Sequence, residues 1–175
     1  MRLAFTGASG TGKTSIASEV AEVYGIPLCP VGARTVAAEM GFKNPYEVDA
    51  AGKRHEFVRR LLQAKSDWEA AHNAFVTDRA HFDNLVYTIV HNQDVVTPEL
   101  TLATATAARR YTNVILCRTD VFQRLGADPT RRHEPEYHAH FQSVLVGLLE
   151  RHWPNYGVFK SADVDARLDE LRIFL

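Results

Sequence analysis

Residues 7–14 read Gly-Ala-Ser-Gly-Thr-Gly-Lys-Thr. This stretch fits the pattern G-x-x-x-x-G-K-[ST], a loop whose glycines let consecutive backbone N–H groups turn inward around a phosphate. The apolar Leu3-Ala4-Phe5 before it suits a buried strand, and residues 13–24 after it have the apolar spacing of a helix. The N-terminus of such a helix adds partial positive charge to an anion site. Strand, loop and helix together predict a nucleoside triphosphate site.

The residues of this phosphate-binding loop have distinct expected roles. Lys13 is expected to reach the β- and γ-phosphates, and the hydroxyl of Thr14 to ligate Mg²⁺. ATP and Mg²⁺ are therefore the predicted ligands. The loop residues expected to surround the nucleotide are Gly7, Ser9, Gly10, Thr11, Gly12, Lys13, Thr14 and Ser15.

The bulk properties indicate one ordinary globular domain over residues 1–175. A formal charge of −1 gives no general basic field for nucleic acid, although a local basic groove is compatible with it. The cysteines, Cys29 and Cys117, lie in apolar segments and are expected to be reduced core residues of a cytoplasmic protein. No targeting or membrane-spanning segment is expected. If the gene is carried by a phage, the location is the host cytoplasm.

Short apolar runs alternate with longer amphipathic ones, which is typical of a parallel sheet with crossover helices. The predicted fold is a three-layer α/β P-loop fold, with a five-stranded parallel sheet and helices on both faces. The expected strands are residues 2–6, 27–29, 74–77, 113–117 and 157–159. The expected helices are residues 13–24, 33–40, 53–72, 80–92, 98–111, 135–152 and 162–174.

A second chemical element follows the third expected strand, where Phe75-Val76-Thr77 leads into Asp78-Arg79. At the carboxyl end of a parallel strand, Asp78 can approach the Mg²⁺–phosphate centre, as a metal ligand or as the base for an attacking hydroxyl. Arg79 can hold an acceptor or the transferred phosphoryl group. The alternatives are a helix N-cap for Asp78 and a surface cation for Arg79.

The residue after Asp78 helps to sort the classes of P-loop protein. Motor-type ATPases follow the strand aspartate with a glutamate that activates water, and here that position is Arg79. The guanine-reading pattern Asn-Lys-x-Asp does not occur in the sequence. Both observations argue against an AAA-type ATPase or a GTPase and favour a kinase.

Arginines gather after the fourth expected strand. Gly126 and Pro129 lie among them, as in a mobile segment that closes over phosphates, excludes water and neutralises charge. We expect a lid at about residues 124–134, with Arg131 and Arg132 as its catalytic cations; a solvated loop is the alternative. The arginines of this region are Arg118, Arg124, Arg131 and Arg132.

These motifs make the chain resemble the P-loop nucleoside and nucleotide kinases, in particular a small branch similar to nicotinamide riboside kinases. The phosphate-binding loop, Val76-Thr77-Asp78-Arg79 and the arginine region fall in the order of that family. Three further segments resemble bacteriophage kinases that phosphorylate hydroxymethyluracil bases in DNA. They are Pro30-Val31-Gly32-Ala33-Arg34, Asn44-Pro45-Tyr46-Glu47-Val48-Asp49 and Asp83-Asn84-Leu85-Val86-Tyr87-Thr88.

One departure from the family bears on the catalytic base. Many relatives carry an acidic residue after the second strand, whereas Val31 and Gly32 precede Arg34 here. Asp78 is therefore the leading base and Asp83 the second choice. The residues expected to contact the acceptor are Arg34, Asp83 and Arg79.

The predicted acceptor is a nucleoside-like hydroxyl, with hydroxymethyluracil in phage DNA favoured. A DNA acceptor would present backbone phosphates to nearby cations, for which we expect Arg34, Arg54, Arg59 and Arg60. The alternatives are a free nucleoside, a nucleoside monophosphate, or a regulatory ATP-binding module. A monophosphate acceptor predicts arginines that converge opposite the phosphate-binding loop.

Overall fold

The fold is that of a computed structural model, which describes residues 1–91, 93–126 and 132–175. Four parallel strands within these ranges form one sheet in the order β2-β1-β3-β4. The strands are β1 (Arg2–Thr6), β2 (Phe75–Asp78), β3 (Asn113–Leu116) and β4 (Gly157–Val158). The central strand β1 pairs with β2 through Leu3↔Val76 and with β3 through Phe5↔Ile115.

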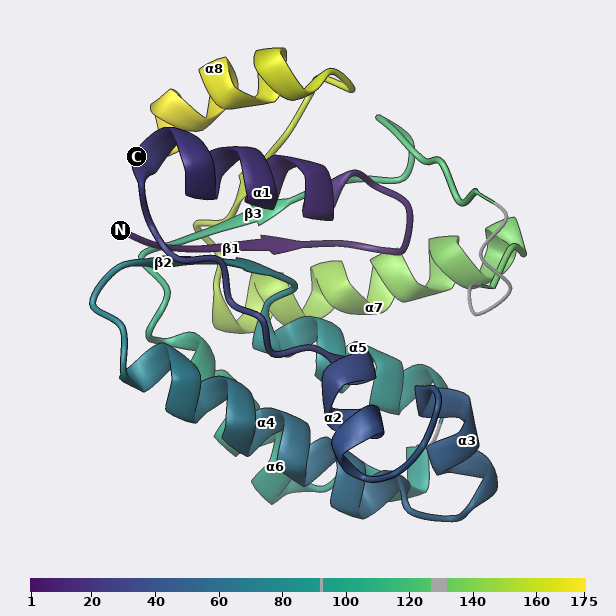
Figure 1. Ribbon diagram of the computed structural model, residues 1–175. Coiled ribbons are helices and arrows are strands. Elements are labelled where there is room, and N and C mark those ends of the chain that lie inside the picture. Colours follow the sequence, from purple (N-terminus) through teal and green to yellow (C-terminus); the bar gives the residue numbers. More distant parts are fainter. Residues whose placement is uncertain (92, 127–131) are drawn as a thin grey trace.

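Helices cover both faces of the sheet, as Figure 1 shows. Because neighbouring side chains of a strand point to opposite faces, Leu3 and Phe5 pack toward α1 (Lys13–Tyr24) and α8 (Val164–Phe174). Ala4 packs toward the other layer, in the same core as side chains of α5 (His81–His91), α6 (Pro98–Ala108) and α7 (Pro135–His152). The predicted three-layer α/β fold is confirmed.

A third apolar cluster is separate from the cores of these two layers. It joins α2 (Ala33–Glu39), α3 (Pro45–Ala50) and α4 (Arg54–Ala70) through Val36, Val48 and Phe57. In Figure 1, α2, α3 and α4 lie on the same side of the sheet as α5, away from α1 and α8. This cluster therefore extends the helical layer on that side of the sheet.

The expected fifth strand is the main error in the predicted fold. Residues 27–29 form only one isolated bridge, Leu28↔Val76, supported by hydrogen bonds from Val76 N to Pro27 O and from Cys29 N to Val76 O. Pro27 faces β2 but has no N–H to donate, so the ladder cannot extend toward the N-terminus from this bridge. The sheet of the described residues has four strands instead of five.

Most expected helices occur within a few residues of their predicted bounds, and two short ones were missed. One is α3, whose N-terminus is capped by the Asn44 side chain, which accepts from Tyr46 N and Glu47 N. The other is the 3₁₀ turn η1 (Gln93–Val95).

Cys29 and Cys117 are buried free thiols. None of the helices in the described ranges combines the length and apolarity needed to cross a membrane.

Candidate active site

Two cavities meet at the carboxyl ends of β1 and β2. The first, here called the P-loop cavity, has a volume of about 330 Å³ and follows the phosphate-binding loop. The second, here called the acceptor cavity, has a volume of about 340 Å³ and extends between α2, α3, α4 and α5. The residues that line both cavities are Ser9, Thr14, Asp78 and Arg79.

The P-loop cavity is lined by most of the residues predicted to surround a nucleotide. The predicted loop residues that line it are Ser9, Gly10, Gly12, Lys13, Thr14 and Ser15. The other two, Gly7 and Thr11, are buried beneath the loop. A Cβ on Gly7 would lie 2.3 Å from Cys117 O, and the φ of Gly7 is +140°, so only glycine fits there.

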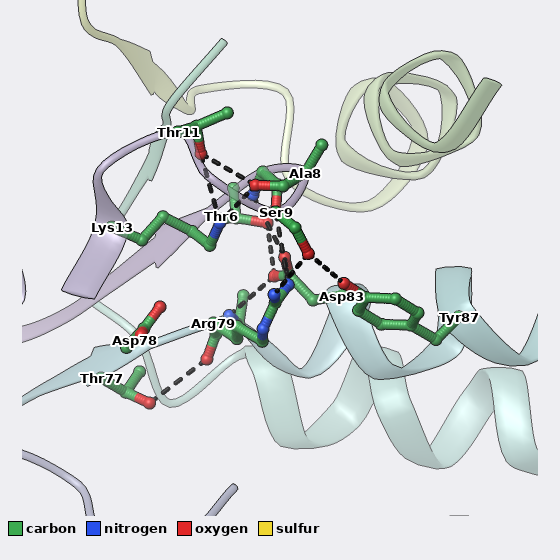
Figure 2. A network of polar contacts seen from close by, with 12 residues as sticks. Thr6, Ala8, Ser9, Thr11, Lys13, Thr77, Asp78, Arg79, Asp83 and Tyr87 are labelled. Carbon is green, nitrogen blue, oxygen red and sulfur yellow. Dashed lines mark hydrogen bonds and ion pairs between the residues drawn. The ribbon is translucent and has the colours of Figure 1, made fainter. Parts of the chain in front are cut away.

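Lys13 is buried and folds back onto its own loop. Its Nζ donates to Ala8 O at 2.6 Å and to Thr11 Oγ1 at 3.2 Å, as Figure 2 shows. Burial and the nearby Arg79 charge lower the pKa of Lys13 from 10.5 to about 8, against the opposing effect of Asp78 and Asp83. The loop therefore holds a poorly solvated cation that an incoming phosphate would complement.

The rear of the loop is held by Arg167 of α8, a residue that the sequence did not indicate. Its NH1 donates to Thr11 O at 2.9 Å, and its Nε donates to Ser161 O at 2.7 Å. A Cβ on Gly12 would lie 2.7 Å from this NH1, so glycine allows the close approach. Arg167 is separated from Thr11 by 156 residues, and no local pattern marks the contact.

Thr14 and Asp78 meet where the two cavities join. Thr14 Oγ1 donates to Asp78 Oδ2 at 2.5 Å, whereas Asp78 Oδ1 is buried and has no hydrogen-bond partner among the described residues. Hydroxyl and carboxylate oxygens are the ligands that Mg²⁺ prefers, usually together with water and substrate phosphates. The pair therefore fits the predicted Mg²⁺ site.

The capping alternative for Asp78 is not what the structure contains. The N–H of Ala80, just before α5, donates to Asp83 Oδ2 at 2.9 Å. The Asp78 carboxylate instead accepts from Thr14 across 64 residues of sequence. Asp78 thus faces the loop cavity from the end of β2.

Arg79 has an unusual backbone and a dense set of contacts. Its φ is 92°, the one positive value among the described residues other than glycine. Its guanidinium donates to Gly7 O at 3.4 Å and to Ser9 Oγ at 3.4 Å, and lies 5.0 Å from the centre of the Tyr87 ring. It lines both cavities, which a surface cation would not do.

Asp83 requires a correction. It was expected to contact the acceptor, but it is fully buried and does not line either cavity. Its carboxylate accepts from Thr6 Oγ1 at 2.6 Å and from Gly7 N at 3.1 Å, and lies 3.5 Å from Arg79 NH1. Burial raises the pKa of Asp83 against the effect of the Arg79 and Lys13 charges. Asp83 therefore shapes the loop and orients Arg79 (Figure 2).

The acceptor cavity combines cations with aromatic rings. Its lining arginines are Arg34, Arg54, Arg79 and Arg132, and its lining rings are Tyr46, Phe57, Tyr87, His91 and Tyr137. Arg34 and Arg79, both predicted to contact the acceptor, lie here. Rings supply flat apolar surface, and guanidinium groups supply donors for anions, so the cavity suits a planar, polar ligand.

Two polar pairs in this cavity were not identified from the sequence. Arg54 NH1 lies 3.2 Å from Asp49 Oδ1, and Arg54 is 7% exposed. His91 Nε2 lies 2.7 Å from the Tyr137 hydroxyl. Burial and the charges of Arg132 and Arg54 lower the pKa of His91, so this ring is neutral at pH 7. The one sequence signal was Asn44-Pro45, an N-cap followed by a first-turn proline, which marks the helix carrying Asp49.

Two arginines of the predicted lid line different cavities. Arg124 lines the P-loop cavity, and its N–H donates to Gly10 O at 2.9 Å. Arg132 lines the acceptor cavity, with its guanidinium 5.3 Å from the centre of the Tyr137 ring. Arg118 pairs with Asp120 at an exposed position. Arg131, predicted to be catalytic, lies outside the described residues, so its position remains a prediction.

The fold is similar to that of several solved structures. A deoxyadenosine kinase from M. mycoides, solved with dCMP and dCDP, is 16% identical with a TM-score of 0.63 over 99% of this chain and 98% of that chain. The YorR protein of Bacillus subtilis, with phosphorylated GDP, is 12% identical with a TM-score of 0.61 over 99% and 95%. Shikimate kinase from Aquifex aeolicus is 14% identical with a TM-score of 0.60 over 99% and 95%. At these identities the likeness shows the fold alone.

Sequence comparison adds the family. No curated protein matches the chain by sequence, whereas a family described as "AAA domain" matches residues 2–167. The absence of a glutamate after Asp78 had argued against an AAA-type ATPase. That position is occupied by Arg79, whose side chain contacts Gly7, Ser9 and Tyr87. The chain belongs to the AAA domain family, and its fold is the one found in P-loop nucleoside, nucleotide and shikimate kinases.

Proposed function

We propose that this protein transfers the γ-phosphoryl group of ATP to a hydroxyl of a nucleoside-like acceptor. One observation carries the proposal: the P-loop cavity and the acceptor cavity meet at Thr14, Asp78 and Arg79. An ATPase needs only a water molecule beside the γ-phosphate, whereas a kinase needs space for a second substrate. A second cavity of about 340 Å³ is within the size range of small-molecule sites.

Donor binding is assigned to the loop. Its backbone N–H groups and Lys13 Nζ surround the β- and γ-phosphates, so Lys13 exchanges its contacts with Ala8 and Thr11 for phosphate oxygens. Thr14 and Asp78 would hold Mg²⁺, which supplies charge neutralisation on the phosphate oxygens when bound. Arg124 is placed to neutralise further charge, because it lines the same cavity.

Acceptor activation is assigned to Asp78. It is the carboxylate shared by the two cavities, and its Oδ1 has no partner within the described chain. In this position it can orient the acceptor hydroxyl and accept its proton. Arg79 would bind the phosphoryl group during transfer, from the side of the acceptor cavity. Gly7, Ser9 and Tyr87 hold its guanidinium where the two cavities meet.

The cavity lining supports a nucleoside-like acceptor. Phe57, Tyr87 and Tyr137 offer flat surface for a base, and Asp49 with Arg54 offers an acceptor and donors for polar groups. The solved neighbours include a deoxyadenosine kinase and shikimate kinases, whose names denote hydroxyl acceptors of modest size. These neighbours support the proposal only through the similarity of their folds.

A specific observation favours a second candidate, an acceptor that carries its own phosphate. Four arginines line the acceptor cavity, and a cluster of guanidinium groups is what a phosphate on the acceptor would require. The carboxylates Asp49 and Asp78 line the same cavity against Arg34, Arg54, Arg79 and Arg132, so cations outnumber anions in its described lining. A monophosphate would balance that charge.

The proposed acceptor could also be hydroxymethyluracil within DNA. In that case the target nucleotide would have to flip out of the duplex into the acceptor cavity. Of the arginines expected to contact the DNA backbone, Arg54 is buried beside Asp49, and Arg60 pairs with Glu56 at 2.6 Å on an exposed face. Arg34 and Arg59 are exposed. The present geometry thus supports a small acceptor more directly than a duplex.

The experiment is label transfer from γ-labelled ATP into matched acceptors. The panel contains a nucleoside, its monophosphate, and DNA containing hydroxymethyluracil, each assayed across a salt series. For DNA, the logarithm of apparent affinity should fall with log salt by about 0.7 to 0.9 per phosphate contacted, whereas a nucleoside should be nearly indifferent. Preference for the monophosphate that Arg132→Gln removes, with the KM for ATP unchanged, would establish the second candidate. ATP hydrolysis that no acceptor alters would refute the kinase.

A further inference from the structure

A buried polar cluster lies behind β2, outside the machinery assigned above. It is formed by side chains of α4, β2, α5 and the segment before β3, and each of its members is at most 2% exposed. We call it the α4 cluster. Its members are Lys65, Thr77, Glu69, His81 and Tyr111.

The members of the α4 cluster are linked to one another by polar contacts. Lys65 Nζ donates to Thr77 Oγ1 and lies 3.5 Å from Glu69 Oε1. Glu69 Oε2 lies 2.9 Å from His81 Nε2, and Glu69 Oε1 accepts from the Tyr111 hydroxyl at 2.9 Å. The Tyr111 oxygen in turn accepts from the backbone N–H of His81 at 3.2 Å.

The charges of the cluster follow from this environment. Burial alone would raise the pKa of Glu69, but the hydrogen bond from His81, the charge of Lys65 and the hydrogen bond from Tyr111 lower it below its ordinary value. Burial lowers the pKa of His81 against the effect of Glu69. The cluster thus holds one buried ion pair, Lys65–Glu69, with a neutral His81 at pH 7. Buried ion pairs contribute little to stability compared with apolar packing, so stability alone does not account for the Lys65–Glu69 pair.

The two ends of the cluster hold residues on either side of Arg79. The Thr77 hydroxyl, which accepts a hydrogen bond from Lys65, also donates one to the backbone oxygen of Arg79 at 3.2 Å. Thr77 lies two residues before Arg79. His81, two residues after Arg79, is held through its ring by Glu69 and through its N–H by Tyr111. A non-glycine residue with φ 92° persists only where its surroundings fix it, and the cluster fixes both flanks.

We propose that Lys65 and Glu69 are positioning residues that hold the turn of residues 77–81, so that Asp78 and Arg79 face the junction of the two cavities. The inference rests on the proposed function for its kinetic consequence. Its structural consequence, the rigidity of the turn, is independent of any reaction. Neither side chain lines a cavity, so neither is expected to contact a substrate.

The test uses the full chain and a matched pair at Thr77. Thr77→Val keeps the shape and removes the hydroxyl that links Lys65 to Arg79 O, whereas Thr77→Ser keeps the hydroxyl. Lys65→Met with Glu69→Gln removes the ion pair without leaving one charge unpaired. Leu171→Ala in α8 is the control, because Leu171 is fully buried and α8 lies on the opposite side of the sheet from α4 and α5 (Figure 1). Circular dichroism sets an assay temperature at which every variant is folded.

Two readouts separate positioning from stability. In transfer assays, Thr77→Val and the double variant should lower kcat by about 10- to 100-fold, the cost of a small misplacement, with the KM for ATP little changed. Thr77→Ser and Leu171→Ala should retain kcat within about twofold of the wild type. In hydrogen-exchange mass spectrometry without ligands, peptides covering residues 75–83 should exchange faster in Thr77→Val and in the double variant, but not in the control.

The outcomes are distinct. Unchanged kcat in Thr77→Val, or exchange in residues 75–83 that rises no more than in Leu171→Ala, would overturn the positioning role. If the wild-type protein transfers label to no acceptor, the proposed function fails. The exchange comparison then still decides whether the α4 cluster holds the turn.

Discussion

Replacing Lys13 with Met tests the idea that the phosphate-binding loop stores an unfavourable charge that a phosphate relieves. Lys13 is 4% exposed, and its hydrogen-bond partners are the neutral oxygens of Ala8 and Thr11. Burial and the Arg79 charge lower the pKa of Lys13 from 10.5 to about 8. Methionine has a similar length without the charge. We therefore expect Lys13→Met to be more stable than the wild type in the absence of nucleotide.

The magnitude and its sign follow from proton linkage. The folded state holds the Lys13 proton less tightly than the unfolded chain, so a charged Lys13 destabilises the folded protein at pH values below 8. The difference between 10.5 and about 8 corresponds to about 3 kcal/mol. This cost shrinks as the pH rises from 8 to 10.5 and is absent above 10.5. Between pH 7 and pH 9.5 the wild type should thus gain about 2 kcal/mol relative to Lys13→Met.

The assay is urea unfolding of both proteins at pH 7 and pH 9.5 without nucleotide. The change in the stability difference with pH isolates the protonation of Lys13, because the two proteins share all their other titratable groups. Saturating ATP and Mg²⁺ should stabilise the wild type and leave Lys13→Met nearly unaffected. A stability difference that stays constant between the two pH values would refute the buried-charge argument, provided that the urea m-values match.

Three further substitutions test separate parts of the site. Asp78→Asn should lower kcat by about 10²- to 10⁴-fold in steady-state transfer assays if Asp78 is the base or metal ligand; an active variant would remove that role. Asp83→Asn should lower the free energy of unfolding by about 1–3 kcal/mol, because an amide cannot accept from Thr6, Gly7 and Ala80 at both of its positions; unchanged urea unfolding would contradict the structural role. Arg167→Met should raise the Kd for ATP about tenfold, since Thr11 O loses its donor, and leave the KM of the acceptor unchanged; calorimetry that shows equal ATP affinity would contradict that contact.

The parts of the site that the sequence predicted are those whose signals are local. The phosphate-binding loop is a contiguous pattern, and its strand and helix follow directly in the chain. Asp78 and Arg79 were also predictable, because a strand precedes them and the carboxyl ends of parallel strands share one edge. Arg34 lines the acceptor cavity, as expected for a residue that contacts the acceptor, whereas Arg132, predicted as a lid cation over the phosphates, lines that cavity instead of the P-loop cavity.

The parts that could not be predicted depend on contacts between distant residues. Asp83 looked like a first-turn acid that could serve as base, but the fold brings Thr6 and Gly7 against it. Arg167 reaches Thr11 from the other end of the chain. The acceptor cavity depends on how α2, α3 and α4 pack through their own apolar cluster, which periodicity alone does not place. Residues 27–29 have strand composition, but they form only one bridge, and Pro27 has no N–H with which to extend it toward the N-terminus.

The central claim is that the γ-phosphoryl group passes from the P-loop cavity to a second substrate instead of to water. The most direct measurement is the fate of the label from γ-labelled ATP when the acceptor panel is added in excess. The account predicts that one acceptor accelerates ATP consumption and that nearly all label appears in that acceptor, with both effects lost in Asp78→Asn. Label that appears only as inorganic phosphate, at a rate that no acceptor changes, would contradict the account and leave an ATPase.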